Sequence, residues 1–138
     1  MTQEPTFFLD RSLGNNVVAD LLRAGGVTVE LHDSHFPQDC ADDVWIPAVT
    51  EKGWLILTKD GRIRKRAGHL EALRAAGAAA FILTSADATG SENANAFLRA
   101  LDRVRRLAAK YMRPLIATVS PSGQVTVIEG RRRGGVQR

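Results

Sequence analysis

The stretch Trp54-Leu55-Ile56-Leu57-Thr58-Lys59-Asp60 decides the fold class of this chain. An apolar run that contains a β-branched residue and ends in polar residues and a carboxylate is typical of a strand buried on both faces. Asp60 would then lie just past the carboxyl end of that strand, where open α/β sheets bind their ligands. The same pattern recurs at Thr6-Phe7-Phe8-Leu9-Asp10. The two stretches together predict a parallel sheet with an aspartate at the end of each of these strands.

Strands and helices are expected to alternate along the rest of the chain. Further strands are predicted at residues 27–31, 79–83 and 114–119, and helices at about 17–24, 68–76 and 91–110. The segment Thr89-Gly90-Ser91-Glu92 has the capping-box form that starts a helix. Ser122-Gly123 forms a turn into residues 124–128, which predicts a C-terminal β-hairpin. This alternation indicates an α/β protein, a three-layer α/β/α sandwich with a mostly parallel central sheet.

The segment before the third strand contains an acidic pair, Asp42-Asp43, and a proline, Pro47. Acidic residues suit the start of a helix, where backbone N–H groups are free. Pro47 would interrupt a helix that began at Asp43, because proline has no N–H to donate. We therefore expect a turn over residues 42–46 and a short helix from about Ile46 to Lys52.

The composition is that of one ordinary domain. The chain has 138 residues, of which 44% are hydrophobic and 25% charged, so it can bury a core. We expect a domain at residues 1–129 and a basic, disordered tail at 130–138. No apolar run approaches the ~20 residues of a membrane span, and no secretory signal is recognisable. The single cysteine, Cys40, fits a reducing compartment, so a cytoplasmic location is expected.

The two halves of the chain carry opposite charge. Residues 1–60 hold four lysines and arginines against ten acidic residues, a net charge of −6, whereas residues 61–138 hold fifteen against five, a net charge of +10. Carboxylates for a metal ion beside cations for a phosphodiester backbone suit a metal-dependent nuclease. Two solvated surfaces of opposite sign are the alternative.

Three separate parts of the chain contribute carboxylates to one edge of the predicted sheet. Asp10 and Asp60 follow strands, and the Asp42-Asp43 pair can fold over the same edge. Carboxylates brought together in this way repel one another unless a cation lies between them, and hard oxygen ligands suit Mg²⁺ or Mn²⁺. We predict that Asp10, Asp42 and Asp60 are metal ligands and that Asp43 ligates or orients a water. As single residues, aspartates after strands are more often turn or cap residues.

Polar and basic residues beside these carboxylates are candidates for binding the substrate: Thr58, Lys59, Arg62, Arg64, Lys65, Arg66 and Ser85. Phosphate contacts of this kind fix the register of a nucleic acid without reading its sequence. A second basic group recurs at helical spacing, at Arg99, Arg103, Arg106 and Lys110. That stripe is either a solvated helix face or a surface for phosphate or a partner.

Other candidate residues carry weaker patterns. His32, His35 and Cys40 could be read as part of a zinc site, but a fourth ligand at a usual spacing is lacking. The two histidines are instead expected to cap the loop or to stack near the substrate. Trp45 and Trp54 are expected to be core or interface residues.

The motifs Phe7-Phe8-Leu9-Asp10, Asp42-x-x-Trp45 and Ile56-Leu57-Thr58-Lys59-Asp60 together resemble those of PIN-like domains. The pieces occur in the same order and span residues 7 to about 66. The segments His32-Asp33-x-His35-Phe36 and Asp60-x-Arg62-Ile63-Arg64 look like a compact PIN-like family related to the VapC-type toxins of toxin–antitoxin pairs. By motif, the aspartates of that family fall on Asp10, Asp42 and Asp60.

The resemblance implies an α/β/α nuclease fold and Mg²⁺- or Mn²⁺-dependent cleavage of RNA. It also implies a cognate antitoxin protein as partner and a homodimer. Larger PIN domains carry a further acid on a helix between the second and third strands, and that region is short here. Asp43 or Asp33 could substitute for that acid. The alternatives are a non-catalytic PIN-like module that binds nucleic acid or a protein, and, more distantly, a receiver-like fold, for which the expected lysine after the fifth strand is missing.

Overall fold

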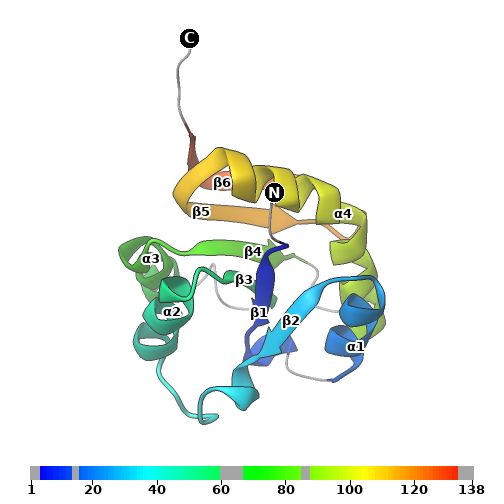
Figure 1. The fold of residues 1–138 in the computed structure, drawn as a ribbon, viewed down its shortest axis with the longest axis horizontal. Helices are drawn as coiled ribbons and strands as arrows, with labels where there is room; N and C mark the ends of the chain where they lie inside the picture. Colours follow the sequence, from blue (N-terminus) through cyan, green and yellow to red (C-terminus); the bar gives the residue numbers. More distant parts are fainter. Residues whose placement is uncertain (1–3, 14–15, 60–66, 85–87, 134–138) are drawn as a thin grey trace.

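The computed structural model describes residues 4–13, 16–59, 67–84 and 88–133. Strands and helices alternate along this part of the chain, as the sequence predicts (Figure 1). The strands are β1 (Thr6–Leu9), β2 (Thr28–Leu31), β3 (Leu55–Lys59), β4 (Ala79–Leu83), β5 (Tyr111–Val119) and β6 (Val125–Arg132). The α-helices are α1 (Asn16–Ala24), α2 (Asp42–Glu51), α3 (Ala67–Ala76) and α4 (Gly90–Lys110), and the short 3₁₀ turns are η1 (Arg11–Leu13) and η2 (His32–Ser34).

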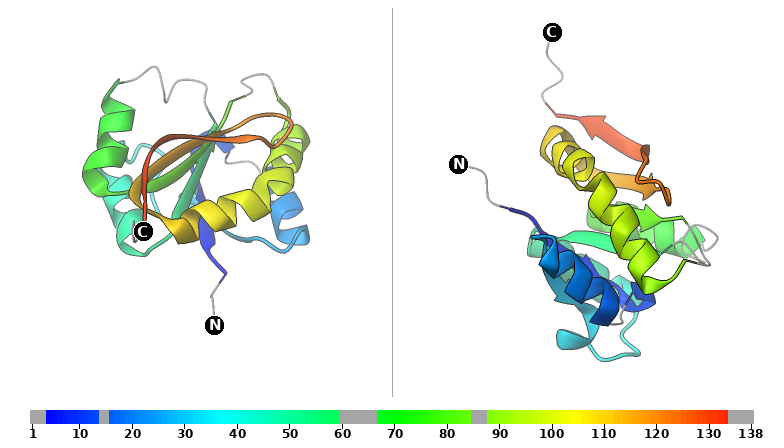
Figure 2. Two further views of the ribbon diagram at one scale, coloured as in Figure 1. Left: turned by 90° about the horizontal axis from the view of Figure 1, so that it is seen from above. Right: turned by 90° about the vertical axis from the view of Figure 1, so that its right-hand side faces the viewer.

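The strands form one sheet in the order β2-β1-β3-β4-β5-β6. Neighbouring strands are parallel from β2 to β5, and β6 pairs antiparallel with β5 as the predicted terminal hairpin. Helices α1 and α4 cover one face of the sheet, and α2 and α3 cover the other (Figure 2). The predicted three-layer α/β/α sandwich is therefore confirmed.

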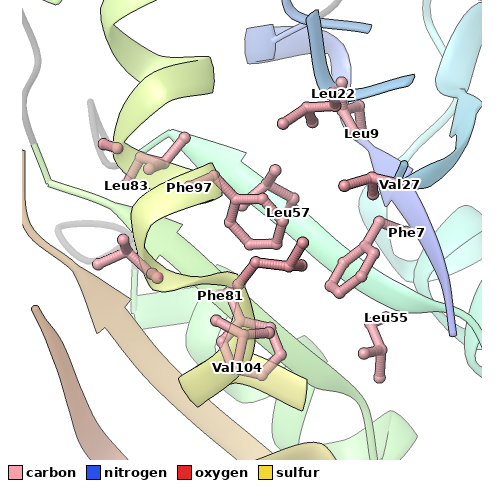
Figure 3. Packing of buried hydrophobic residues seen from close by; sticks show 14 of the residues in the cluster. Phe7, Leu9, Leu22, Val27, Leu55, Leu57, Phe81, Leu83, Phe97 and Val104 are labelled. Carbon is pink, nitrogen blue, oxygen red and sulfur yellow. The ribbon is translucent and has the colours of Figure 1, made fainter. Parts of the chain in front are cut away.

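Both faces of the central strands are buried, which is why their sequences are apolar without alternation. Phe7, Leu57 and Phe81 point to the α1 and α4 side, where Phe97 of α4 meets Phe7 edge-on at a ring-centroid distance of 5.0 Å (Figure 3). Phe8 and its neighbours face α2 and α3 on the other side of the sheet. Burial on two faces fixes the register of these strands, and so the positions of the residues that follow them.

The capping box predicted at the start of α4 is present. The Thr89 hydroxyl accepts from the Glu92 backbone N–H at 3.2 Å, and the Glu92 carboxylate accepts from the Thr89 backbone N–H at 2.8 Å. These two bonds satisfy free donors of the first turn. The helix that they begin is the longest of the described part of the chain, as predicted.

Helix α2 differs from the prediction, because it begins at Asp42 and contains Pro47. The expected turn over residues 42–46 is wrong. Trp45, Ile46 and Val49 are all buried against the sheet, and this packing outweighs the one hydrogen bond that the proline removes. Pro47 itself is exposed, so its ring is not forced into the core.

The buried face of α1 and the end of β6 also differ from the predictions. Val17, which was expected on the buried face of α1, is 50% exposed, and Val18, Ala19 and Leu22 make the buried face instead. Strand β6 continues to Arg132, which pairs with Tyr111, so residues 130–132 are part of the sheet and were expected in the tail. No helix in the described ranges is both long and apolar enough to cross a membrane.

Candidate active site

Asp10 lies at the point where the strand order of the sheet reverses. From β1 the chain passes to β2 on one side, and β3 then pairs with β1 on the other side. The crevice outside the carboxyl ends of two such strands is where α/β sheets bind ligands. Asp10 directly follows β1, and its backbone N–H donates to the Leu57 carbonyl of β3 at 3.2 Å. The carboxylate is thus held beside the ends of both strands.

The Asp10 side chain is fixed by hydroxyl groups from two segments. Its Oδ1 accepts from the backbone N–H of Ser12 at 2.9 Å and from the Ser12 hydroxyl at 2.5 Å. Its Oδ2 accepts from the Thr58 hydroxyl at 2.5 Å. The Ser12 Oγ also accepts from the Lys59 backbone N–H at 3.0 Å. Ser12 therefore joins the turn after β1 to the end of β3, and it orients the aspartate between them.

The pKa of the Asp10 carboxyl is raised above its ordinary value. Burial, which removes water from the charged form, is the largest cause, and the nearby negative charge of Asp42 adds to it. The hydrogen bonds from Ser12 and Thr58 act in the opposite direction, because they stabilise the carboxylate. A charged Asp10 is therefore costly in the free protein, and a bound cation would lower that cost.

Asp42 comes to the same place from the first turn of α2. Its Oδ1 accepts from the Trp45 indole Nε1 at 2.9 Å, and Trp45 is only 3% exposed. The Asp42-x-x-Trp45 spacing puts the two side chains on one side of the helix, three residues apart. The core tryptophan thus aims the carboxylate. Asp43, the next residue, is exposed and does not line the pocket described below.

An open pocket of about 240 Å³ contains both carboxylates. Its walls include Asp10 and Arg11 after β1, His32 after β2, and Asp42 with Trp45 from α2. The loop before α2 closes it with Asp39 and Cys40. The structure therefore brings two of the predicted carboxylates together in one hollow at the carboxyl edge of the sheet.

The remaining predicted residues have different positions. Thr58 is 1% exposed and gives its hydroxyl hydrogen to Asp10, so it positions the carboxylate and a substrate would not reach it directly. Lys59 is half-buried at the end of β3. The other predicted residues lie outside the described part of the chain: Asp60, Arg62, Arg64, Lys65, Arg66 and Ser85.

A second hollow, of about 300 Å³, lies along the same edge beyond the ends of β4 and β5. Thr84, Asn93 and Arg99 are among the residues that line it. Arg99 is exposed, as are the other members of its predicted basic stripe, Arg103, Arg106 and Lys110. Of that stripe only Arg99 lines this hollow, because α4 runs back across the sheet and ends at Lys110, directly before the start of β5.

The residues of the first pocket suit a divalent cation. Asp10 and Asp42 supply hard oxygen atoms, and their mutual repulsion is the situation that a cation relieves. One ring nitrogen of His32, which also lines this pocket, is buried and has no hydrogen-bond partner among the described residues, so it is a further candidate ligand atom. Among the described residues, no three histidine, cysteine or acidic side chains are grouped closely enough to hold an ion. A third ligand would therefore have to come from movement or from Asp60.

Sequence reasoning missed the role of several residues that form or support this site. Ser12 could have been recognised, because a serine two residues after an aspartate commonly closes a local turn with it. The role of Trp45 in aiming Asp42 was available from the three-residue spacing. Asp39 has no such signal, since its place in the wall depends on how the loop before α2 folds.

Comparison with known proteins agrees with this geometry. Residues 5–85, more than half of the chain, match the family model of a PIN like domain. A curated relative from Mycobacterium tuberculosis, named "Putative ribonuclease VapC45", is 34% identical over 125 residues, which cover 88% of this chain and 90% of the relative. No solved structure matches the chain. The family match and the carboxylate-bearing edge of the sheet lead to one conclusion: this chain belongs to the PIN-like domain family, in the branch related to the VapC-type toxins.

Proposed function

We propose that this protein is a metal-dependent endoribonuclease that hydrolyses RNA phosphodiester bonds. The observation that carries the proposal is the Asp10 carboxylate, held by Ser12 and Thr58 at the reversal point of the sheet and facing a pocket shared with Asp42. The name of the curated relative, a ribonuclease, supports RNA as the substrate. Mg²⁺ or Mn²⁺ is the cation that a pocket of carboxylate oxygens would take.

The roles of the residues follow from their positions. Asp10 and Asp42, with Asp60, would hold the cation, which when bound polarises a phosphate oxygen and makes a bound water more acidic. Ser12 and Thr58 keep the Asp10 oxygens fixed, and Trp45 does the same for Asp42. Asp39, at the pocket wall, is a further acid that could accept a proton from an attacking water. Asp43 is exposed outside the pocket, so we assign it no catalytic step.

RNA would lie along the edge of the sheet. The second hollow, with Thr84, Asn93 and Arg99, lies beyond β4 on the same edge as the carboxylates. An extended nucleic acid chain that passes both hollows would place phosphates beside Arg99 and beside the basic segment that follows β3, where Arg62, Arg64 and Lys65 stand in the sequence. Contacts of this kind are electrostatic and weaken as salt rises.

The test is RNA cleavage by the purified protein in the presence of Mn²⁺. We expect Asp10→Asn and Asp60→Asn each to abolish cleavage, because each removes a ligand charge while keeping the shape of the side chain. Asp102→Asn is the matched control, since Asp102 is 87% exposed on α4 and takes no part in the site. Equal activity of the wild type and both site variants would refute the proposal.

The same experiment separates a second class of function. Full RNA binding by the wild type without cleavage at any Mn²⁺ or Mg²⁺ concentration would favour a non-catalytic PIN-like module. We also propose that the protein acts as the toxin of a toxin–antitoxin pair, held inactive by a small antitoxin and working as a homodimer. A neighbouring reading frame that encodes a protein forming a complex with this chain and blocking cleavage is the expected finding.

A further inference from the structure

The His32 ring is only 1% exposed and is surrounded by aromatic side chains. Its centroid lies 6.0 Å from Phe8, 5.6 Å from Phe36 and 5.7 Å from Trp45. The Nδ1 atom is 3.3 Å from Oδ1 of Asp33. The Nε2 atom is buried and has no hydrogen-bond partner in the part of the chain that the structure describes. An unpaired buried nitrogen lowers the stability of the folded protein. A bound group that interacts with Nε2 would remove this cost.

The position of the ring indicates where that partner binds. His32 lines the pocket that contains Asp10 and Asp42. His35, three residues later, provides the contrast, because its Nε2 is 2.7 Å from Oε1 of Glu30 and it does not line the pocket. Of the two neighbouring histidines, only His32 lines the carboxylate pocket, and its Nε2 is a buried nitrogen without a hydrogen-bond partner among the described residues.

The contact between Nδ1 and Asp33 decides what the free nitrogen can bind. When Nδ1 donates its hydrogen to a carboxylate, Nε2 carries a lone pair and can only accept a hydrogen bond or ligate a metal. A histidine that binds a metal through one nitrogen typically donates the other N–H to a carboxylate or carbonyl, which fixes its orientation. His32 has both features, because its Nδ1 lies beside the Asp33 carboxylate and the residue lines the pocket.

We propose that Nε2 of His32 is a nitrogen ligand of the divalent cation, and that the site therefore prefers Mn²⁺ to Mg²⁺. The inference rests on the cation of the proposed function and adds its identity. Imidazole suits transition-metal ions, whereas Mg²⁺ favours oxygen ligands and bound water. Because no three described side chains form a ready-made group, binding of the ion in this way would require the His32 ring and the two carboxylates to move closer together.

The experiment uses the full chain and Mn²⁺ alone as the probe. Pulsed electron paramagnetic resonance of the wild-type complex is expected to show the coupling of a histidine nitrogen to Mn²⁺. His32→Gln should remove this coupling and weaken Mn²⁺ affinity by roughly 10- to 100-fold, with a smaller loss of Mg²⁺ affinity. His35→Gln is the matched control and should keep both the coupling and the preference for Mn²⁺.

The outcomes distinguish this inference from the proposed nuclease activity. Absence of nitrogen coupling in the wild type overturns the inference, even if the protein folds, binds Mn²⁺ and cleaves RNA. Coupling that persists in folded His32→Gln assigns the nitrogen to another residue and also overturns it. Nitrogen coupling that depends on His32 in a protein that cleaves no RNA would keep the inference and refute the nuclease. A wild type that binds no Mn²⁺ would overturn both.

Discussion

At the scale of single residues, Asp10 combines a function with a cost to stability. Its carboxylate is oriented by Ser12 and Thr58, yet burial and the charge of Asp42 raise its pKa. A group whose pKa is raised by folding stabilises the folded protein below the unfolded value, here 3.8, and that contribution is lost as the pH rises through the raised value. The charged aspartate is therefore retained at neutral pH at the expense of stability, as expected of a residue kept for its chemistry.

This linkage predicts that Asp10→Asn stabilises the protein at neutral pH. The amide keeps the shape of the carboxyl group but carries no charge into the buried site. The midpoint of thermal unfolding at pH 7 should be higher for the variant than for the wild type, and the difference should disappear below pH 3.8. Asp102→Asn, on the exposed face of α4, should show no such pH-dependent gain. A less stable Asp10→Asn at pH 7 would contradict the assigned cause of the pKa shift.

The position of Asp10 could be predicted from the sequence because it depends on a local pattern, an apolar run followed by an aspartate. Asp42 could be placed at the same edge from its acidic pair and its three-residue spacing from a tryptophan, although the helix that it begins was expected only from about Ile46. The place of His32 could not be predicted. Its burial depends on Phe8 of β1 and Trp45 of α2, which reach it from two other segments, and no spacing within its own loop encodes those contacts.

At the scale of elements, α2 carries Asp42 into the site in spite of Pro47. A proline inside a helix removes one hydrogen bond and crowds the carbonyl four residues earlier, which is that of Asp43. The helix persists because Trp45, Ile46 and Val49 are buried. Sequence rules treat the proline as a boundary, since they weigh local hydrogen bonding and cannot see the packing of the opposite face.

We predict that Pro47→Ala stabilises the protein. The new N–H can donate to the Asp43 carbonyl. Alanine is favoured over proline inside a helix by about 3 kcal/mol. The gain in unfolding free energy should be smaller here, because the surrounding structure is already adapted to proline. Urea unfolding should show an increase of roughly 1–2 kcal/mol, with RNA cleavage unchanged because Pro47 is exposed and outside the pocket. A loss of stability would mean that the proline fixes the start of the helix.

At the scale of the whole molecule, the topology brings together two carboxylates that are far apart in the chain, Asp10 after β1 and Asp42 in α2. Strands β1 and β3 are parallel neighbours. The sheet order itself was not predicted, and it is what places both strand ends beside α2.

The most direct test of the proposed metal site is isothermal titration calorimetry with Mn²⁺. The proteins compared are the wild type, Asp10→Asn, Asp42→Asn and Asp60→Asn. If three segments of the chain hold one ion, the wild type binds it and each of the three variants loses that binding, while Asp102→Asn binds as the wild type does. Wild-type affinity in any of the three variants would contradict the claim that these carboxylates form a single metal site.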